Sequence, residues 1–328
     1  MEKLKKTRLE VLDLMQGIAM LWVLIGHHLL PVMPSGYSSF HYYIYSFHMP
    51  LFIAISGFLI AYSYKNLSYK AYVWKRFKKF FVPYFWVGMT ISVLAGISQG
   101  WESLPVNALY LLVAPLQSEA TFLWYIYLLF FLYALYPVIH RVSHLYPCTS
   151  AGVGLLLGVI GYGYSWSYPY FCLGYFTKYF LFYFLGILCA RHVDFFFLHR
   201  KKVLWLANVG LFAFLFFSLQ ERLAGGSPFL YHAICLTSIP GMLALAVWMK
   251  RIASCRKGLV WVSRNCFAIY LLHMFFVQAL ALVVGRLQGG LPLGTMEAVV
   301  YVAVSSLLAM WGAVYTFKMF YLVKNRLL

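Results

Sequence analysis

The sequence is poor in charge, and above all in acidic residues. Charged residues make up 10% of its 328 residues, and only 8 are Asp or Glu. Hydrophobic residues make up 63%, and the mean hydropathy is +0.78. A soluble domain carries about 25% charged residues, so this composition excludes an ordinary soluble protein. It predicts an all-α, polytopic integral membrane protein.

Cysteine is scarce, and the features that divide a chain into domains are missing. The six cysteines are scattered in or beside apolar segments, with neither paired nor metal-like spacing. We therefore expect neither a disulfide framework nor a metal site. The sequence shows no long polar linker, low-complexity tract or fixed-period repeat. These absences predict a single integral domain over residues 1–328.

Long apolar runs predict ten transmembrane helices, since about 20 residues cross a ~30 Å hydrocarbon core. The first run is too long for a signal peptide, and no small-residue cleavage site follows it. We therefore expect it to be retained. The predicted spans are 11–31, 46–64, 80–98, 121–140, 150–167, 171–190, 203–219, 228–249, 259–281 and 295–317.

The basic residues lie almost entirely on one side of this topology. The net charge is +18. Outside the predicted cytoplasmic segments lie only Lys178, Arg222 and Arg286. This asymmetry follows the positive-inside rule, and it predicts a multi-pass protein of the cell membrane with both termini in the cytoplasm. The charge therefore indicates topology and contact with anionic lipid or an anionic ligand, and nucleic acid is not expected as a partner.

The first span carries a stripe of polar side chains. Gln16 and His27 are eleven residues apart, which returns a helix to within about 20° at a distance of ~16.5 Å. Asp13 lies one turn before Gln16 on the same face, and His28 follows His27. Polar groups in a membrane are costly and mark functional sites by default. The alternative is that these residues only pair with neighbouring helices.

Two further groups lie in and after the second span. His48 enters that span from the outer side, where it could approach His27, although a lone histidine at a span end is also an interfacial anchor. The basic cluster that includes Arg76 and Lys79 could bind lipid headgroups or a phosphorylated ligand. The topology signal explains the same charges equally well.

These residues together resemble the acyltransferase family 3 membrane proteins, which O-acylate cell-surface glycans and related acceptors. The resemblance covers nearly the whole chain and consists of six motifs in the family's order. They are Arg8, Leu12-Asp13, Gly17-Ile18-Ala19 and His27; Phe47-His48-Met49-Pro50-Leu51-Phe52 with Ser56-Gly57-Phe58; Lys75-Arg76, Lys79 and Pro83-Tyr84; Leu123-Trp124-Tyr125 through Tyr136-Pro137; Tyr183-Phe184-Leu185-Gly186; and Ile269-Tyr270-Leu271-Leu272-His273.

The resemblance implies an O-acyltransferase that moves an acyl group, most simply acetyl, from cytoplasmic acyl-CoA to a carbohydrate hydroxyl. Acyl-CoA is then a co-substrate, and no cofactor is permanently bound. His27 is the expected general base. The other expected binding residues are Arg8, Arg76 and Lys79 at the CoA phosphates, Asp13 and Gln16 at the inner mouth, Trp124 along the tunnel, and His28, His48 and His273 in the cavity.

One position departs from the family pattern. The family typically has arginine eleven residues before its histidine, whereas this chain has Gln16. Glutamine donates hydrogen bonds but carries no charge. Either the phosphates are bound elsewhere, by Arg8, Arg76 or Lys79, or this member is altered in donor or impaired. Because His27 is retained, we expect activity.

Two other classes of function compete with an enzyme. A transporter or flippase of a glycan precursor or proton-coupled solute would use the histidines and Asp13 as a relay. The sequence shows no pair of Gly/Pro-broken spans at matching places in two halves, which such proteins often have. A scaffold subunit of glycan-synthesis machinery would leave the polar stripe unexplained. The sequence does not fix the oligomeric state.

Overall fold

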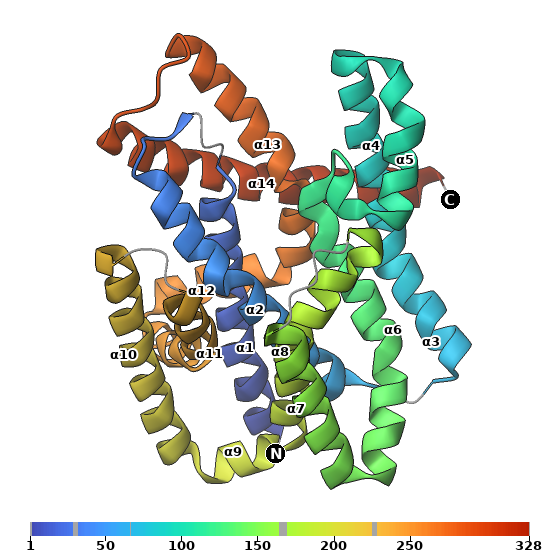
Figure 1. Ribbon diagram of the computed structural model, residues 1–328, viewed down its shortest axis with the longest axis vertical. Coiled ribbons are helices and arrows are strands. Elements are labelled where there is room, and N and C mark those ends of the chain that lie inside the picture. The colour runs from blue at the N-terminus through green and yellow to red at the C-terminus, as the bar shows by residue number, and fades with distance from the viewer. Residues whose placement is uncertain (1, 29–31, 66, 164–168, 225–227, 328) are drawn as a thin grey trace. The chain divides into compact units, whose positions relative to one another are not determined.

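The computed structural model describes residues 2–28, 32–65, 67–163, 169–224 and 228–327, and within these ranges all regular structure is helical (Figure 1). The chain is an all-α, polytopic membrane protein, as predicted. Eight helical segments of the described residues are long and apolar enough to cross a membrane. They are Tyr43–Ser63, Tyr69–Ser98, Thr121–Leu145, Tyr170–Arg191, Arg200–Gln220, Phe229–Met249, Cys266–Leu287 and Thr295–Phe320.

The other two predicted spans coincide with helices that are not among these eight. The span predicted at 11–31 corresponds to α1 (Glu2–Gly26), whose side chains are described from Glu10 onward. The span predicted at 150–167 corresponds to α7 (Pro147–Gly163), a shorter apolar helix, and its predicted end lies outside the described residues.

Several predicted boundaries are wrong, and in two cases a charged stretch forms a helix. The span predicted from 259 begins only at α13 (Cys266–Leu287). The basic stretch before it forms a separate amphipathic helix, α12 (Ala253–Arg264), and Asn265 lies between the two helices. The basic cluster predicted as a loop continues from α3 (Tyr69–Arg76) into a π-helical turn (Phe77–Phe81). Such turns often occur at functional sites.

Contacts group the chain into two compact units. The first comprises Met1–Phe52 and His199–Leu328, and the second comprises Ile53–Leu198. The single domain predicted from the sequence stays a prediction. The remaining helices are α2 (Tyr37–Ser63), α4 (Val82–Gln99), α5 (Leu104–Val113), α6 (Trp124–Leu145), α8 (Leu173–Arg191), α9 (Val193–Leu198), α10 (Arg200–Ala224), α11 (Pro228–Met249) and α14 (Thr295–Leu327).

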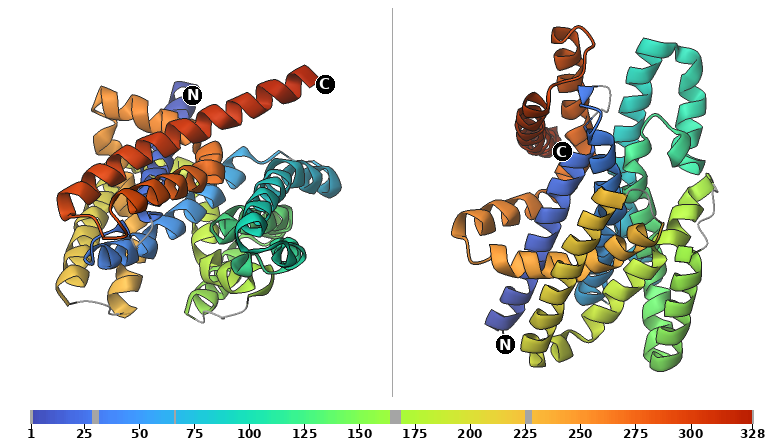
Figure 2. Two further views of the ribbon diagram at one scale, coloured as in Figure 1. Left: turned by 90° about the horizontal axis from the view of Figure 1, so that it is seen from above. Right: turned by 60° about the vertical axis from the view of Figure 1, so that its left-hand side comes forward.

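In the first unit, α1 packs on α11, α12, α13 and α14. Its contact with α12 is very close, because a Cβ at Gly17 would overlap the carbonyl group of Leu259. Helices α13 and α14 also pack on each other (Figure 2). The segment that joins them is tied to the chain after α1 by a 3.0 Å bond from the Leu293 amide to the Val32 carbonyl. This packing gives the end of α1 a fixed environment made by α13 and α14.

In the second unit, the second half of α2 packs closely against α8. A Cβ at Gly57 would overlap the carbonyl oxygen of Tyr183, and a Cβ at Gly186 would overlap that of Ala54. Small residues allow helices in a membrane to approach this closely. Gly57 and Gly186 thus allow the close packing of α2 and α8.

Large apolar side chains cover the surfaces of several helices. Phe212 on α10 is 74% exposed, and Trp311 on α14 is 62% exposed. A soluble monomer rarely exposes apolar patches of such extent. Exposed apolar helix faces are what a lipid environment requires.

The contact at Gly57 predicts the effect of one added methyl group. Gly57→Ala should lower the thermal stability of the detergent-solubilised protein by about 1–3 kcal/mol, the usual cost of overpacking. Gly152 on α7 has open space around its Cβ position, so Gly152→Ala should leave stability unchanged or slightly raised. A Gly57→Ala protein that unfolds at the wild-type temperature would contradict this packing.

Candidate active site

His27 follows directly after the end of α1. Its ring Nδ1 lies 2.7 Å from the Val23 carbonyl oxygen, and its amide binds the Leu24 carbonyl at 3.3 Å. The helix ends at Gly26, one residue before this ring. The sequence placed His27 inside a longer span, and the structure shows that this boundary was wrong.

Three imidazoles meet at this point within the first unit. The ring centroid of His27 lies 5.1 Å from that of His273 on α13 and 6.3 Å from that of His48 on α2. Both neighbours pack edge-on to His27. The predicted approach of His48 to His27 is therefore present in the structure, and so is the predicted location of His273 beside them.

Each of the three rings is held by a contact between its Nδ1 and a backbone carbonyl. Nδ1 of His48 lies 2.6 Å from the Ile44 carbonyl, and Nδ1 of His273 lies 2.8 Å from the Tyr270 carbonyl. A carbonyl only accepts, so each neutral ring carries its proton on Nδ1 and has a lone pair on Nε2. His48 and His273 are fully buried, whereas His27 is partly exposed. His27 is thus the member of the cluster that has accessible surface.

The cluster is not arranged as a metal centre. Among the side chains that the structure describes, no group of three or more His, Cys, Asp or Glu residues is placed to hold a metal ion. An imidazole with an acceptor lone pair can instead take a proton from a hydroxyl group. The arrangement can therefore perform general base chemistry.

His28 faces a different helix. Its Nε2 lies 2.5 Å from the hydroxyl oxygen of Ser305 on α14, and its ring packs edge-on to Tyr301. Ser305 could not be singled out from the sequence, because it is one of several hydroxyl residues in an apolar helix. Only the long-range contact shows its association with a histidine.

Asp13 and Gln16 lie on one face of α1, as predicted, and share a partner. The Ser263 hydroxyl on α12 lies 2.9 Å from the Gln16 side-chain oxygen and 3.5 Å from an Asp13 carboxylate oxygen. Ser263 is a further residue that sequence reasoning missed. Gln16 therefore occupies a polar contact between helices, next to a carboxylate.

The second unit holds Arg76, Lys79 and Trp124. The guanidinium of Arg76 lies between the rings of Tyr72 and Tyr133, at 5.1 and 5.2 Å from their centroids. Its Nε is buried and has no hydrogen-bond partner among the described residues. Lys79 is exposed. The side chain of Arg8 lies outside the described residues.

Trp124 begins α6 among tyrosines of the same unit. Its ring stacks on Tyr179 at a centroid distance of 5.6 Å and meets Tyr175 edge-on at 4.5 Å. This aromatic group is partly exposed at Trp124. It offers flat apolar surface of the kind that packs on a sugar ring or an acyl chain.

Two titratable groups lie just before the α2 span. Burial lowers the pKa of His41, whose ring lies 4.1 Å from that of Tyr45. Burial also raises the pKa of Tyr37, whose hydroxyl donates to the Ile25 carbonyl. Both shifts favour the uncharged forms, so these two groups add no charge to this end of α2 at neutral pH.

A family model described as an acyltransferase domain matches residues 9–318, nearly the whole chain. The chain belongs to the acyltransferase 3 family. The resemblance found in the sequence motifs is thereby confirmed. No solved structure matches the chain.

Two curated proteins are similar over half of this acyltransferase 3 chain. Both are named nodulation protein NolL. The Mesorhizobium japonicum protein is 27% identical over 173 residues, which is 50% of this chain and 46% of the relative. The Sinorhizobium fredii protein is 29% identical over 172 residues, which is 50% of this chain and 47% of the relative. The aligned region thus spans about half the length of these relatives.

The neighbourhood of Gln16 predicts how arginine would behave there. In Gln16→Arg, the new cation lies one turn from Asp13, so it gains a carboxylate partner. Thermal stability should therefore stay near that of the wild type, and affinity for acyl-CoA should be kept or raised. The double variant Asp13→Asn/Gln16→Arg lacks this partner and should lose about 1–3 kcal/mol.

The single variant Asp13→Asn is the reference for that comparison. Thermal unfolding and CoA binding are measured on all four proteins. If Gln16→Arg is destabilised as much as the double variant, Asp13 is not its partner. Weaker CoA binding at unchanged stability would mean that Gln16 does not stand in for the family's arginine.

Proposed function

We propose that the protein transfers an acyl group, most simply acetyl, from cytoplasmic acyl-CoA to a hydroxyl of a cell-surface or lipid-linked carbohydrate. The observation that carries this proposal is the partly exposed His27, whose Nδ1 is bound by the Val23 carbonyl so that Nε2 presents a lone pair. Membership of the acyltransferase 3 family supports the reaction class. The cell membrane, with both termini cytoplasmic, is the proposed location.

In this proposal His27 is the general base. Its Nε2 accepts the proton of the acceptor hydroxyl as the oxygen attacks the thioester carbonyl carbon. The new C–O bond forms, the C–S bond breaks, and the proton is returned to the departing CoA thiolate. The Nδ1–H group of the transient imidazolium donates a hydrogen bond to the Val23 carbonyl, and this bond stabilises the positive charge.

Arg76 and Lys79 are the proposed contacts for the CoA phosphates, with Arg8 as a further candidate. A guanidinium that packs between tyrosine rings without a described carboxylate is suited to an anionic ligand. Salt bridges among the described residues involve Glu10 with Lys250 and Arg256, not Arg76. Trp124 and its tyrosines are the proposed surface for the acyl chain or sugar.

The base assignment predicts the effect of removing one imidazole. His27→Ala should lower acyl transfer by roughly 10²–10⁴-fold, the usual contribution of a general base. His144 is exposed at the end of α6, so His144→Ala should retain wild-type turnover. Release of CoA from acetyl-CoA and acceptor by purified protein is the measurement. Wild-type turnover in a folded His27→Ala protein would refute the assignment, and no transfer by any form would refute the enzyme function.

The donor assignment predicts a selective loss of CoA affinity. Arg76→Gln/Lys79→Gln should raise the Kd for CoA about 10–100-fold, because charged hydrogen bonds contribute about 1.5–3 kcal/mol. The matched control is Lys65→Gln/Lys70→Gln, which removes two exposed charges from the same stretch. Isothermal calorimetry compares the pairs. Equal affinity in both would assign these charges to topology alone.

A further inference from the structure

His28 and Ser305 form a continuous chain of hydrogen bonds with two backbone carbonyls. Nδ1 of His28 lies 3.1 Å from the Ile25 carbonyl, and Nε2 lies 2.5 Å from the Ser305 hydroxyl. The same hydroxyl lies 2.6 Å from the carbonyl of Tyr301, one turn earlier on α14. The His28 and Ser305 side chains are 2% and 1% exposed.

This chain of contacts has fewer protons than bonds when His28 is neutral. Three links need three protons, because both terminal carbonyls only accept. A neutral imidazole and a hydroxyl supply two. The third is present only when His28 is an imidazolium. The single Ser305 proton therefore has two acceptors within reach, the Tyr301 carbonyl and His28 Nε2, and His28 is placed to take it.

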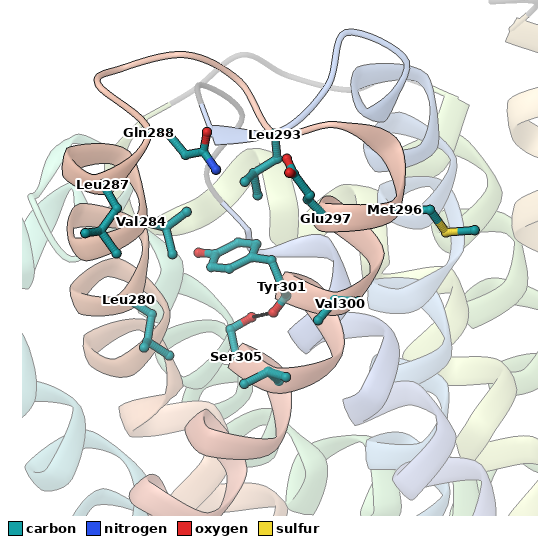
Figure 3. A pocket seen from close by; sticks show the side chains of 11 residues that line it. Leu280, Val284, Leu287, Gln288, Leu293, Met296, Glu297, Val300, Tyr301 and Ser305 are labelled. Atoms are coloured by element: carbon teal, nitrogen blue, oxygen red, sulfur yellow. Dashed lines mark hydrogen bonds between the residues drawn. The ribbon is translucent and has the colours of Figure 1, made fainter.

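Ser305 also lies at the wall of a cavity. A space of about 570 Å³ lies between α13 and α14, and Ser305 is at its inner end (Figure 3). Its walls are largely apolar and include Leu280, Val284 and Val304. A hydroxyl bound to a histidine thus lies beside an open, largely apolar space in which an acyl group could be held.

A second polar group lies in the same cavity. The hydroxyl of Tyr301 is buried and has no hydrogen-bond partner among the described residues. Its ring extends into the cavity toward α13, one turn from Ser305 (Figure 3). A buried unpaired hydroxyl costs stability, and a donor of this kind is suited to an oxyanion that forms during acyl transfer.

We propose that Ser305 is a nucleophile that carries the acyl group as an ester between donor and acceptor, with His28 as its base. This inference rests on the proposed function for its thioester donor, and it replaces the direct attack of the acceptor on the thioester by two successive steps. The Ser305 oxygen attacks the thioester carbon and its proton passes to His28 Nε2. The C–S bond breaks, and the CoA thiolate leaves with that proton. Tyr301 donates to the carbonyl oxygen as it becomes negative.

The second half of the reaction regenerates the serine. The acceptor hydroxyl attacks the acyl–serine ester and His27 takes its proton; the ester C–O bond to Ser305 breaks, and the Ser305 oxygen receives that proton from His27 by way of water. The two adjacent histidines then serve the two half-reactions. Donor and acceptor need not be bound at the same time, because the acyl group waits on Ser305 in an apolar space.

The test is acylation of the purified protein by [¹⁴C]acetyl-CoA without acceptor. The wild type should become labelled with release of one CoA per label, and Ser305→Ala should not be labelled. The matched control is Ser306→Ala, the neighbouring buried serine, whose hydroxyl makes no described hydrogen bond. It should be labelled like the wild type. Transfer to acceptor should fall at least about 100-fold in Ser305→Ala alone.

Ser305→Cys keeps the test decisive if Ser305→Ala does not fold. A thiol at this position would form a thioester, whose label is released by neutral hydroxylamine, whereas the wild-type ester should resist neutral and yield to alkaline hydroxylamine. Active enzyme that stays unlabelled, with full transfer by Ser305→Ala, would overturn the serine carrier and leave the proposed function standing. Label that persists in Ser305→Ala would also overturn it. If no form transfers acetyl or releases CoA, the proposed function itself fails.

Discussion

The bond between the His27 ring and the Val23 carbonyl determines the geometry on which the site depends. α1 ends at Gly26, and this bond fixes the His27 ring at the terminus of the helix. The next residue, His28, then faces Ser305 of α14 instead of the cluster with His273. The two adjacent histidines therefore lie in two different environments, His27 beside His273 and His28 beside Ser305.

Much of the fold could be predicted from the sequence, because the bilayer imposes strong constraints on it. Long apolar runs predicted the membrane class and the positions of most spans. The errors occurred where a local interaction overrides hydropathy. Examples are the early end of α1 at Gly26 and the separate amphipathic helix Ala253–Arg264, whose apolar residues alone looked like the start of α13.

The candidate site was predictable only in part. Helical periodicity placed Asp13 and Gln16 on one face, and both meet Ser263. The order of the spans suggested that His48 could approach His27, and the motif resemblance added His273 to the expected cavity. In the structure, both rings lie beside that of His27. Ser263 and Ser305 could not be predicted, because their partners are about 250 or more residues away in sequence and serine is common in apolar helices. Such contacts are specified by tertiary packing alone.

The proposed function depends on neutral His27 carrying its proton on Nδ1 and presenting Nε2 as the base. ¹⁵N NMR of the histidine-labelled protein in detergent tests this directly, with His27→Gln to assign the signal. The signals lost in the variant should be a protonated Nδ1 and an unprotonated Nε2 at neutral pH. Loss of a protonated Nε2 signal would show the opposite tautomer and contradict the assignment of His27 as general base.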